Sequence, residues 1–336
     1  MELLNNASLQ PFVTFGVEAT CENLYRIEDI EELKLAVRYL DNPLILGGGS
    51  NVLPIGDIKR NVIKVELKGI EIEENLGQDP LVHASVGENW HELVLWTLDR
   101  NLGGIENLSL IPGTVGAAPI QNIGAYGAEL DAVFESLEAL RIGDGEIIQF
   151  TKRDCNFGYR DSIFKREAKD KYVIINASMR LSRDPKVNTS YGAIQDILME
   201  KGISKPTIRD ASNAVIEIRQ SKLPDPAVIG NAGSFFKNPI ISKDRFESLK
   251  EKFPSMPGYP ADKLSMKVPA GWLIETAGWK GKRIGNAGAY EKQALVLVNH
   301  GGATGEEIWN LAMEVIKSVQ NMFAIELSPE VNIWKN

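Results

Sequence analysis

Apolar residues recur at helical spacing in three parts of the chain, and this pattern predicts three amphipathic helices. The first covers about residues 29–40 and is stopped by the Asp-Asn-Pro that follows. The second covers 88–100, and Gly103-Gly104 is expected to end it. The third covers about 305–323, and Thr304 and Glu307 fit a capping box at its start. The residues expected on the buried faces are Ile30, Leu33, Val37 and Leu40; Trp90, Leu93, Val94 and Leu98; and Ile308, Leu311, Ala312, Val315, Ile316 and Val319.

Shorter apolar stretches predict strands. Alternating apolar and polar positions over 172–181 are typical of a half-buried strand. Shorter runs predict strands at 44–46, 62–67 and 331–334, while the polar stretch at 183–206 indicates a domain boundary or an excursion. Because several strands follow one another without a helix between them, the pattern favours α+β layers over one doubly wound parallel sheet.

The first glycine-rich loop follows the predicted strand at 44–46 and is Gly47-Gly48-Gly49-Ser50-Asn51. A second strand comes next, so no helix begins where a Rossmann fold would bind a pyrophosphate. The chain also lacks the G-K-[ST] of a P-loop. Taken alone, such a glycine run is more often a tight turn than a cofactor site.

The second glycine-rich loop covers 111–127 and reads IPGTVGAAPIQNIGAYG, without a charged residue. Its small residues allow backbone N–H groups to approach a large ligand closely. The alternative is a tightly packed crossing between sheets. A diphosphate gripped by backbone amides accounts for both glycine loops together.

Composition and charge limit the possible partners. The 336 residues predict two or three domains. With 45 acidic and 37 basic residues, the net charge is −8, and no run of Lys and Arg suggests a nucleic-acid groove. Cys21 and Cys155 have no C-x-x-C spacing, which disfavours a disulfide scaffold and a zinc site.

The remaining chemistry-bearing and targeting signals are weak. His83, His91 and His300 match no metal-binding motif, and His91 is interpreted as an ordinary partly buried or surface histidine. No signal peptide and no apolar run of membrane-spanning length is evident. We therefore expect a cytoplasmic protein with no metal, no membrane partner and no obligate protein partner.

Six motifs, found in order along nearly the whole chain, resemble those of the UDP-N-acetylenolpyruvoylglucosamine reductase family. They are residues 47–53 (GGGSNVL), 111–127 (the second glycine loop), 157–162 (FGYRDS), 221–226 (SKLPDP), 230–239 (GNAGSFFKNP) and 329–331 (PEV). The chain resembles the longer of the two family types, in which a tyrosine-bearing loop covers the substrate. Thr189-Ser190-Tyr191-Gly192 stands where that loop belongs.

The resemblance implies an α+β fold with an FAD-binding module of the vanillyl-alcohol-oxidase (PCMH) type, made of two α+β lobes, and a C-terminal α+β substrate-binding domain. We expect the first lobe at 1–68, with 331–336 returning to it. The second lobe is expected at 69–214, including the substrate loop near 183–206, and the substrate domain at 215–330.

The implied reaction is the FAD-dependent, NADPH-driven reduction of UDP-N-acetylglucosamine enolpyruvate to UDP-N-acetylmuramate, a step of peptidoglycan precursor synthesis. The hydride would come from reduced flavin and the proton from a serine. The residues that match the family's catalytic set are Arg160, Ser234 and Glu330. A planar guanidinium suits the charge that builds on the substrate carboxylate, and the setting of Ser234 between glycine turns and Phe235-Phe236 is expected to exclude solvent. Glu330 would polarise the same carboxylate as the protonated acid or with a shared proton.

The remaining candidates bind the two ligands. For FAD they are Gly47, Gly48, Gly49, Ser50, Asn51, Pro112, Gly113, Thr114, Gly116, Ala117, Gln121, Asn122, Gly124, Ala125 and Tyr126. For the UDP-sugar they are Tyr159, Tyr191, Lys222, Asn238 and, with weaker support, Gln293.

Plainer interpretations exist for the catalytic and substrate residues. Without the motifs, Arg160 reads as the partner of Asp154 or Asp161, Ser234 as a turn residue, and Glu330, Lys222 and Tyr191 as solvated side chains. Two other functions also remain open. One is an FAD-module oxidase or dehydrogenase acting on another small molecule, and the other is a non-catalytic nucleotide-binding protein.

Overall fold

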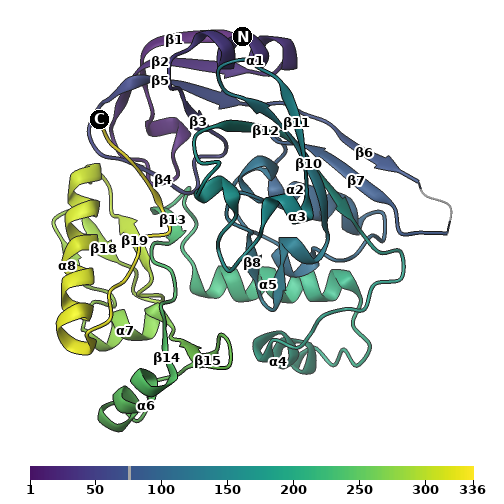
Figure 1. Cartoon of the computed structure of the whole chain (residues 1–336). Coiled ribbons are helices and arrows are strands. Elements are labelled where there is room, and N and C mark those ends of the chain that lie inside the picture. Colours follow the sequence, from purple (N-terminus) through teal and green to yellow (C-terminus); the bar gives the residue numbers. More distant parts are fainter. Residues whose placement is uncertain (75–76) are drawn as a thin grey trace. The chain divides into compact units, whose positions relative to one another are not determined.

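The computed structural model of the chain describes residues 1–74 and 77–336 (Figure 1). It divides into two compact units. Unit 1 contains Met1–Ala7, Cys21–Gly48 and Lys59–Ser221, and unit 2 contains Ser8–Thr20, Gly49–Ile58 and Lys222–Asn336. Both units mix helices with largely antiparallel strands, as the α+β prediction requires.

Unit 1 is built on two sheets. The first has the order β1-β2-β5-β3, and β3 pairs with β5 in parallel. The second has the order β11-β10-β12-β7-β6, and the pairs of β10 with β11 and β12, and of β7 with β12 and β6, are antiparallel. The strand bounds are β1 Glu2–Ser8, β2 Thr20–Ile27, β3 Leu44–Leu46, β5 Ile58–Val65, β6 Ile70–Glu73, β7 Leu81–Ser85, β10 Phe134–Arg141, β11 Ile147–Thr151 and β12 Tyr172–Arg180.

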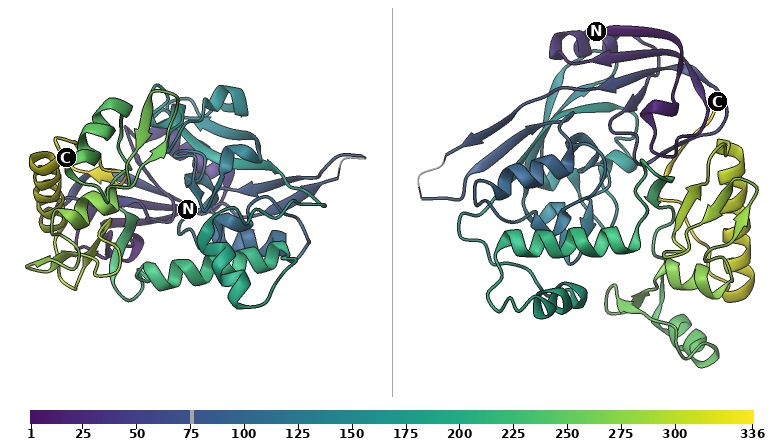
Figure 2. Two further views of the ribbon diagram at one scale, coloured as in Figure 1. Left: turned by 90° about the horizontal axis from the view of Figure 1, so that it is seen from below. Right: turned by 180° about the vertical axis from the view of Figure 1, so that it is seen from behind.

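The helices of unit 1 include two of the three predicted from spacing. The α-helices of this unit are α1 Ile30–Tyr39, α2 Trp90–Leu98, α3 Lys152–Cys155, α4 Gly192–Glu200 and α5 Ile208–Lys222, of which the last residue, Lys222, belongs to unit 2. The four α2 residues predicted to face inward are all buried, and with Leu33 and Val37 of α1 they belong to one core cluster. In Figures 1 and 2, α4 and α5 lie side by side, and their apolar residues form a smaller core of their own.

Two expectations for unit 1 need correction, and a third is made more specific. The second helix ends at Leu98, before Gly103-Gly104, because Asn101 takes the left-handed conformation (φ 54°) and Leu102 N–H closes the end on Thr97 O at 3.0 Å. The strand at 172–181 is buried on both faces, since β12 is the central strand of its sheet. The polar stretch at 183–206 contains α4, which buries Ile194 and Leu198.

Unit 2 contains a sheet of order β13-β19-β18-β17 and a smaller one of order β14-β16-β15. Helix α8 (Gly305–Phe323) contacts β18 and β19 and lies along them in Figure 1. Its bounds and the Thr304/Glu307 capping box are as predicted, with Ile316 half-buried rather than buried. The other elements of this unit are β13 Gly230–Ser234, β14 Ile240–Ser242, β15 Tyr259–Pro260, β16 Ser265–Lys267, β17 Arg283–Ile284, β18 Ala287–Ala289 and β19 Val296–Asn299, with α6 Lys243–Lys252 and α7 Ala270–Thr276.

The last strand pairs with the residues that follow the first glycine loop. Strand β20 (Asn332–Trp334) lies parallel to β4 (Val52–Pro54), with Asn332 opposite Val52. Asn332 N–H also donates to Asn51 O at 3.0 Å. This pairing places the end of the chain, within unit 2, beside the part of the first glycine-rich loop that begins at Gly49.

Candidate functional site

The candidate residues divide between the two units, and each set is described in its own unit. Unit 1 holds Arg160, Gly47, Gly48, the candidates of the second glycine loop, Tyr159 and Tyr191. Unit 2 holds Ser234, Glu330, Gly49, Ser50, Asn51, Lys222, Asn238 and Gln293.

The two glycine-rich loops lie in contact in unit 1. A Cβ on Gly48 would stand 2.8 Å from Gly113 Cα, and one on Gly47 would stand 2.6 Å from Thr114 Oγ1. Gly113 has φ 113°, in a region that favours glycine. The Cβ at position 48 would meet a backbone atom, so glycine at 48 is needed to bring the two loop backbones together, whereas the atom that faces Gly47 belongs to the Thr114 side chain.

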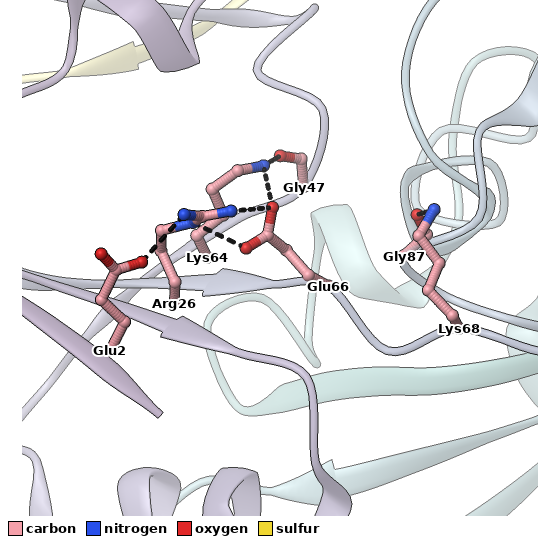
Figure 3. Close-up of polar contacts among 7 residues, drawn as sticks. All are labelled: Glu2, Arg26, Gly47, Lys64, Glu66, Lys68 and Gly87. Atoms are coloured by element: carbon pink, nitrogen blue, oxygen red, sulfur yellow. Dashed lines mark hydrogen bonds and ion pairs between the residues drawn. The ribbon is translucent and has the colours of Figure 1, made fainter.

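A cluster of charged residues supports the first loop from β5 (Figure 3). Lys64 Nζ donates to Gly47 O at 3.1 Å and lies 3.7 Å from Glu66 Oε1, which forms an ion pair with Arg26 on its other side. Burial lowers the pKa of Lys64, and the nearby Glu66 carboxylate partly offsets this. Lys68 Nζ donates in the same way to Gly87 O at 2.6 Å.

The first residue of α2 and the segment between β7 and α2 fix the start of the second loop. Trp90 N–H donates to Gly113 O at 3.0 Å, Val115 N–H to Glu88 O at 2.9 Å, and Gly116 N–H to Val86 O at 3.1 Å. Val115–Ala117 then form a single 3-10 turn, η3. Pro112 comes just before these anchors, and Gln121 lies between them and the hairpin that follows.

The end of the second loop is a hairpin, and Arg160 is bound to it. Strands β8 (Gly124–Ala125) and β9 (Ala128–Glu129) are joined by Tyr126-Gly127, both with positive φ, as in a type I′ turn. An Nη2 proton of Arg160 is donated to Gly124 O, and a Cβ on Gly124 would stand 2.8 Å from Arg160 Nη1. Gly124 is therefore required for the guanidinium to lie against the loop.

Arg160 stands on a tight turn closed by Gly158 and Asp161, whose backbones exchange bonds of 3.0 and 3.1 Å, and its own φ is 54°. Its Cζ lies 5.5 Å from the centre of the Tyr159 ring. The two acids first considered as ion-pair partners have other roles: Asp161 pairs with Arg166, and Asp154 caps α3.

Asn122 connects the loop to this turn. It is 1% exposed, and its amide donates to Glu129 Oε2 and to Gly158 O, both at 3.1 Å, and accepts from Asp131 N at 3.0 Å. Its side chain thus joins the hairpin to the Tyr159-Arg160 turn, which is a role that sequence analysis did not foresee.

Two further residues of this region were missed. Arg219 of α5 donates to Leu110 O at 3.2 Å and hydrogen-bonds the Tyr126 hydroxyl. Burial lowers the pKa of Arg219 and raises that of Tyr126, and the nearby Arg160 charge lowers the pKa of Arg219 further. In the sequence, the signal that could have identified Arg219 is its positive charge just before the Ser221-Lys222 motif. Asn107, the other residue, stands outside every motif.

In unit 2, strand pairing brings together Ser234, Glu330 and Asn51. Glu330 N–H donates to Phe235 O at 2.8 Å, and Lys237 N–H donates to Ser328 O at 2.9 Å. Asn51 Nδ2 donates to Glu330 O at 3.3 Å. Residues from three distant motifs therefore meet at the end of β13.

The environment of Ser234 differs from the expectation. Phe235 and Phe236 are fully buried in the core, while Ser234 itself is exposed. A bulge between Asn231 and Ser234 in the pairing with β19 changes the register here. The two phenylalanines therefore anchor the strand but do not shield the Ser234 hydroxyl from solvent.

Gly49 begins the part of the first loop that belongs to unit 2. Its φ is 64°, and a Cβ there would stand 1.8 Å from Phe12 O. Thr14 N–H donates to Gly49 O at 3.1 Å. No other residue is compatible with this position.

Two of the candidate substrate residues lie at the first turn of α7. Asn238 Oδ1 accepts from Ala270 N at 2.8 Å, and a Cβ on Gly271 would stand 2.8 Å from Gln293 Oε1. Lys222, the last residue of α5, is exposed. Tyr191 of unit 1 is 43% exposed.

Two negative results concern the part of the chain that the structure describes. Within residues 1–74 and 77–336, no helix has the length and apolar character needed to cross a membrane. The same residues contain no group of three or more His, Cys, Asp and Glu side chains that could hold a metal ion.

Comparison with known proteins decides the family. A relative from Flavobacterium johnsoniae called UDP-N-acetylenolpyruvoylglucosamine reductase is 51% identical over 99% of this chain and 100% of its own length. The chain belongs to the UDP-N-acetylenolpyruvoylglucosamine reductase family. A family member from Pseudomonas aeruginosa is 46% identical, with 99% of both chains covered.

Family models and a solved structure agree with this assignment. Residues 225–334 match the C-terminal domain of the family, and residues 23–151 match an FAD binding domain. The crystal structure of the family member from Thermus caldophilus superposes with a TM-score of 0.68 at 23% identity, covering 99% of this chain and 98% of that one. The α+β fold with an FAD-binding module is thereby confirmed, and the chain is an FAD-dependent oxidoreductase.

Proposed function

We propose that this protein catalyses the NADPH-driven reduction of UDP-N-acetylglucosamine enolpyruvate to UDP-N-acetylmuramate for peptidoglycan precursor synthesis. The observation that carries the proposal is the 51% identity to a reductase of that name across essentially the whole of both chains. The cytoplasmic location and the domain boundaries at 68 and 214 stay predictions.

The residues of the glycine loops fit FAD. Residues 111–127 bring no charged side chain that would repel a diphosphate, and their contact with Gly47-Gly48 presents two small-residue backbones together. The amino group of Lys64 lies under the first loop and adds positive charge. We assign FAD binding to Gly47–Asn51 and to the predicted residues between Pro112 and Tyr126. When bound, FAD supplies the hydride chemistry.

Arg160 is assigned to the substrate carboxylate. Its guanidinium is held by Gly124 O, and its backbone by the closed turn at 158–161, so the positive charge is positioned before any ligand binds. A preorganised cation stabilises charge that develops on a carboxylate without reorganisation at the moment of reaction. The planar fork can also bind both carboxylate oxygens.

Ser234 is assigned as the proton donor and Glu330 as the group that polarises the carboxylate. Support comes from their meeting at the end of β13, with Asn51 bonded to the Glu330 carbonyl. The hydroxyl is a weak acid and depends on close positioning. Since Ser234 is exposed in the protein alone, the substrate itself has to exclude water from it.

The UDP end is assigned to Tyr159, Tyr191, Lys222, Asn238 and Gln293. Lys222 offers an exposed cation for the diphosphate. Asn238 and Gln293 stand together at the start of α7, so both can contact one part of a ligand. Tyr191 presents an exposed aromatic ring with few rotatable bonds.

The test is anaerobic visible absorbance of the FAD-loaded protein during addition of NADPH and then of the enolpyruvyl sugar nucleotide. Bleaching by NADPH and recovery only with that substrate would support the whole proposal. Bleaching without recovery would reject the substrate, and a protein that does not retain FAD would reject the cofactor assignment as well.

A further inference from the structure

We propose that Asn107 is a positioning residue that holds the segment bearing Tyr191 in place. The role of Tyr191 rests on the proposed function, whereas the contacts of Asn107 are features of the fold. Asn107 lies in the 3-10 helix η2 (Glu106–Leu108) of unit 1 and is 1% exposed. Its side chain joins two segments that both carry candidate ligand-binding residues.

The Asn107 amide donates both of its hydrogens to backbone carbonyls. One bond goes to Tyr126 O, on the turn that ends the second glycine loop, and the other to Asn188 O, each at 2.9 Å. Both partners are carbonyl oxygens, which only accept hydrogen bonds, so the atom of the Asn107 amide that faces them must be the nitrogen. If the amide were flipped, Oδ1 would face both carbonyl oxygens without a hydrogen bond.

The oxygen of the Asn107 amide indicates why an asparagine stands at this position. Asn107 Oδ1 is buried and has no hydrogen-bond partner among the described residues. An unsatisfied buried acceptor costs stability, so an asparagine that only filled space here would be a poor choice. The two donated bonds are the structural reason for an amide at this position.

Asn188 reinforces the connection from the other side. Its Nδ2 donates to Gly127 O at 3.0 Å, next to the carbonyl that Asn107 binds. Its Oδ1 accepts from Ser190 N at 3.1 Å and from Ser190 Oγ at 2.7 Å, which folds 188–190 into a compact turn. We call this arrangement of Asn107 and Asn188 on the Tyr126-Gly127 turn the amide latch.

The amide latch sets the place of Tyr191. The Tyr191 ring meets the Tyr126 ring edge-on, with centroids 5.1 Å apart and planes at 82°. Tyr191 is also the N-cap residue of α4, whose buried face packs on α5 together with Tyr126. The tyrosine is thus held between the latch on one side and the α4–α5 core on the other.

This arrangement orders the Tyr191 segment before a ligand arrives. Binding then avoids much of the entropy cost of fixing a loop and its side chain, which favours substrate affinity rather than the chemical step. Loss of the latch should therefore raise KM for the UDP-sugar and leave flavin reduction by NADPH unchanged.

The experiment compares Asn107→Asp, which keeps the side-chain shape but removes both donors, with Asn188→Ala. Asn23→Ala is the matched control, since Asn23 donates a single amide bond to Asn61 Oδ1 in the same unit, away from the latch. The first measurement is trypsin cleavage after Lys186, an exposed residue of the segment, with the cut identified from fragment masses. Both latch variants should be cut about tenfold faster than the wild type, and the control at the wild-type rate.

The second measurement is steady-state and half-reaction kinetics of the FAD-loaded variants. We expect a KM for the enolpyruvyl sugar nucleotide about tenfold higher, with kcat and flavin reduction by NADPH within about twofold of the wild type. Unchanged cleavage together with unchanged KM would overturn the proposal, as would a loss confined to kcat.

Two features keep the outcome decisive. If Asn107→Asp does not fold, Asn188→Ala decides alone, because Asn188 is only half-buried. If the wild type does not act on the enolpyruvyl sugar nucleotide, the proposed function fails, whereas the cleavage rates still accept or reject the latch.

Discussion

The backbone N–H of Glu330 donates to the carbonyl of Phe235 at 2.8 Å, which fixes the terminal segment beside Ser234. Phe235 is fully buried, so this strand cannot shift without disturbing the core of unit 2. The position of the proposed acid and that of the proposed polarising carboxyl are therefore set by one backbone pairing. Side-chain substitutions at Ser234 and Glu330 should leave that pairing intact.

Ser234→Ala should separate the two half-reactions. Because the hydroxyl is proposed to deliver the proton to the substrate, flavin reduction by NADPH should proceed at the wild-type rate while reoxidation by substrate slows by about 10²-fold or more. Stopped-flow absorbance measures both rates. Ser255→Ala, at an exposed serine of the same unit, is the control and should change neither. Equal slowing of both half-reactions would remove Ser234 from the acid role.

Arg160→Lys tests whether the planar fork is needed rather than the charge alone. Lysine keeps the cation but loses the bidentate geometry, so reoxidation by substrate should slow by about 10²-fold. Arg153→Lys, on the exposed face of α3, changes the same residue type without touching the glycine loop. A lysine variant as fast as the wild type would contradict the assignment of Arg160 to the carboxylate.

The parts of the fold that depend on local periodicity were predictable. Helix α8 has the predicted bounds and capping box because its apolar stripe and Thr304/Glu307 are strong, local signals. Helix α5 carries the same kind of stripe, in Ala211, Ala214, Val215 and Ile218, and the same rule applied to 208–222 would have found it.

The candidate site was predictable only as far as its motifs extend. The motifs name Arg160, Ser234 and Glu330 as candidates, but the meeting of Ser234 with Glu330 and Asn51 depends on pairings between distant segments, which no local pattern encodes. Asn107 was missed for the same reason, since its two acceptors are backbone carbonyls on other segments. Side-chain-to-backbone contacts of this kind leave no spacing in the sequence.

Gly48→Ala should weaken FAD binding. The new Cβ would stand 2.8 Å from Gly113 Cα, a backbone atom that cannot turn aside, so the two glycine loops must separate. We expect the affinity for FAD to fall at least about tenfold, with the fold kept, as measured by fluorescence titration of the apoprotein and by circular dichroism. Gly192→Ala is the control, because a Cβ there meets nothing within 4 Å. Undiminished FAD affinity in Gly48→Ala would show that the contact between the loops is not needed for binding.

The two buried cysteines predict a loss of stability in alkaline solution. Burial raises the pKa of Cys21 to about 11 and of Cys155 to about 12, from 9.0. As pH rises, the thiols therefore lose their protons in the unfolded state before they do so in the folded state. The contribution of these thiols to the free energy of unfolding is fully present below pH 9, and it falls as pH rises toward 11 and 12. Urea unfolding of Cys155→Ala between pH 8 and 10.5 should show a shallower decline than the wild type, and both native thiols should resist alkylation at pH 8. Parallel declines in the two proteins, or rapid alkylation of the native form, would mean that the thiols are not buried as the structure has them.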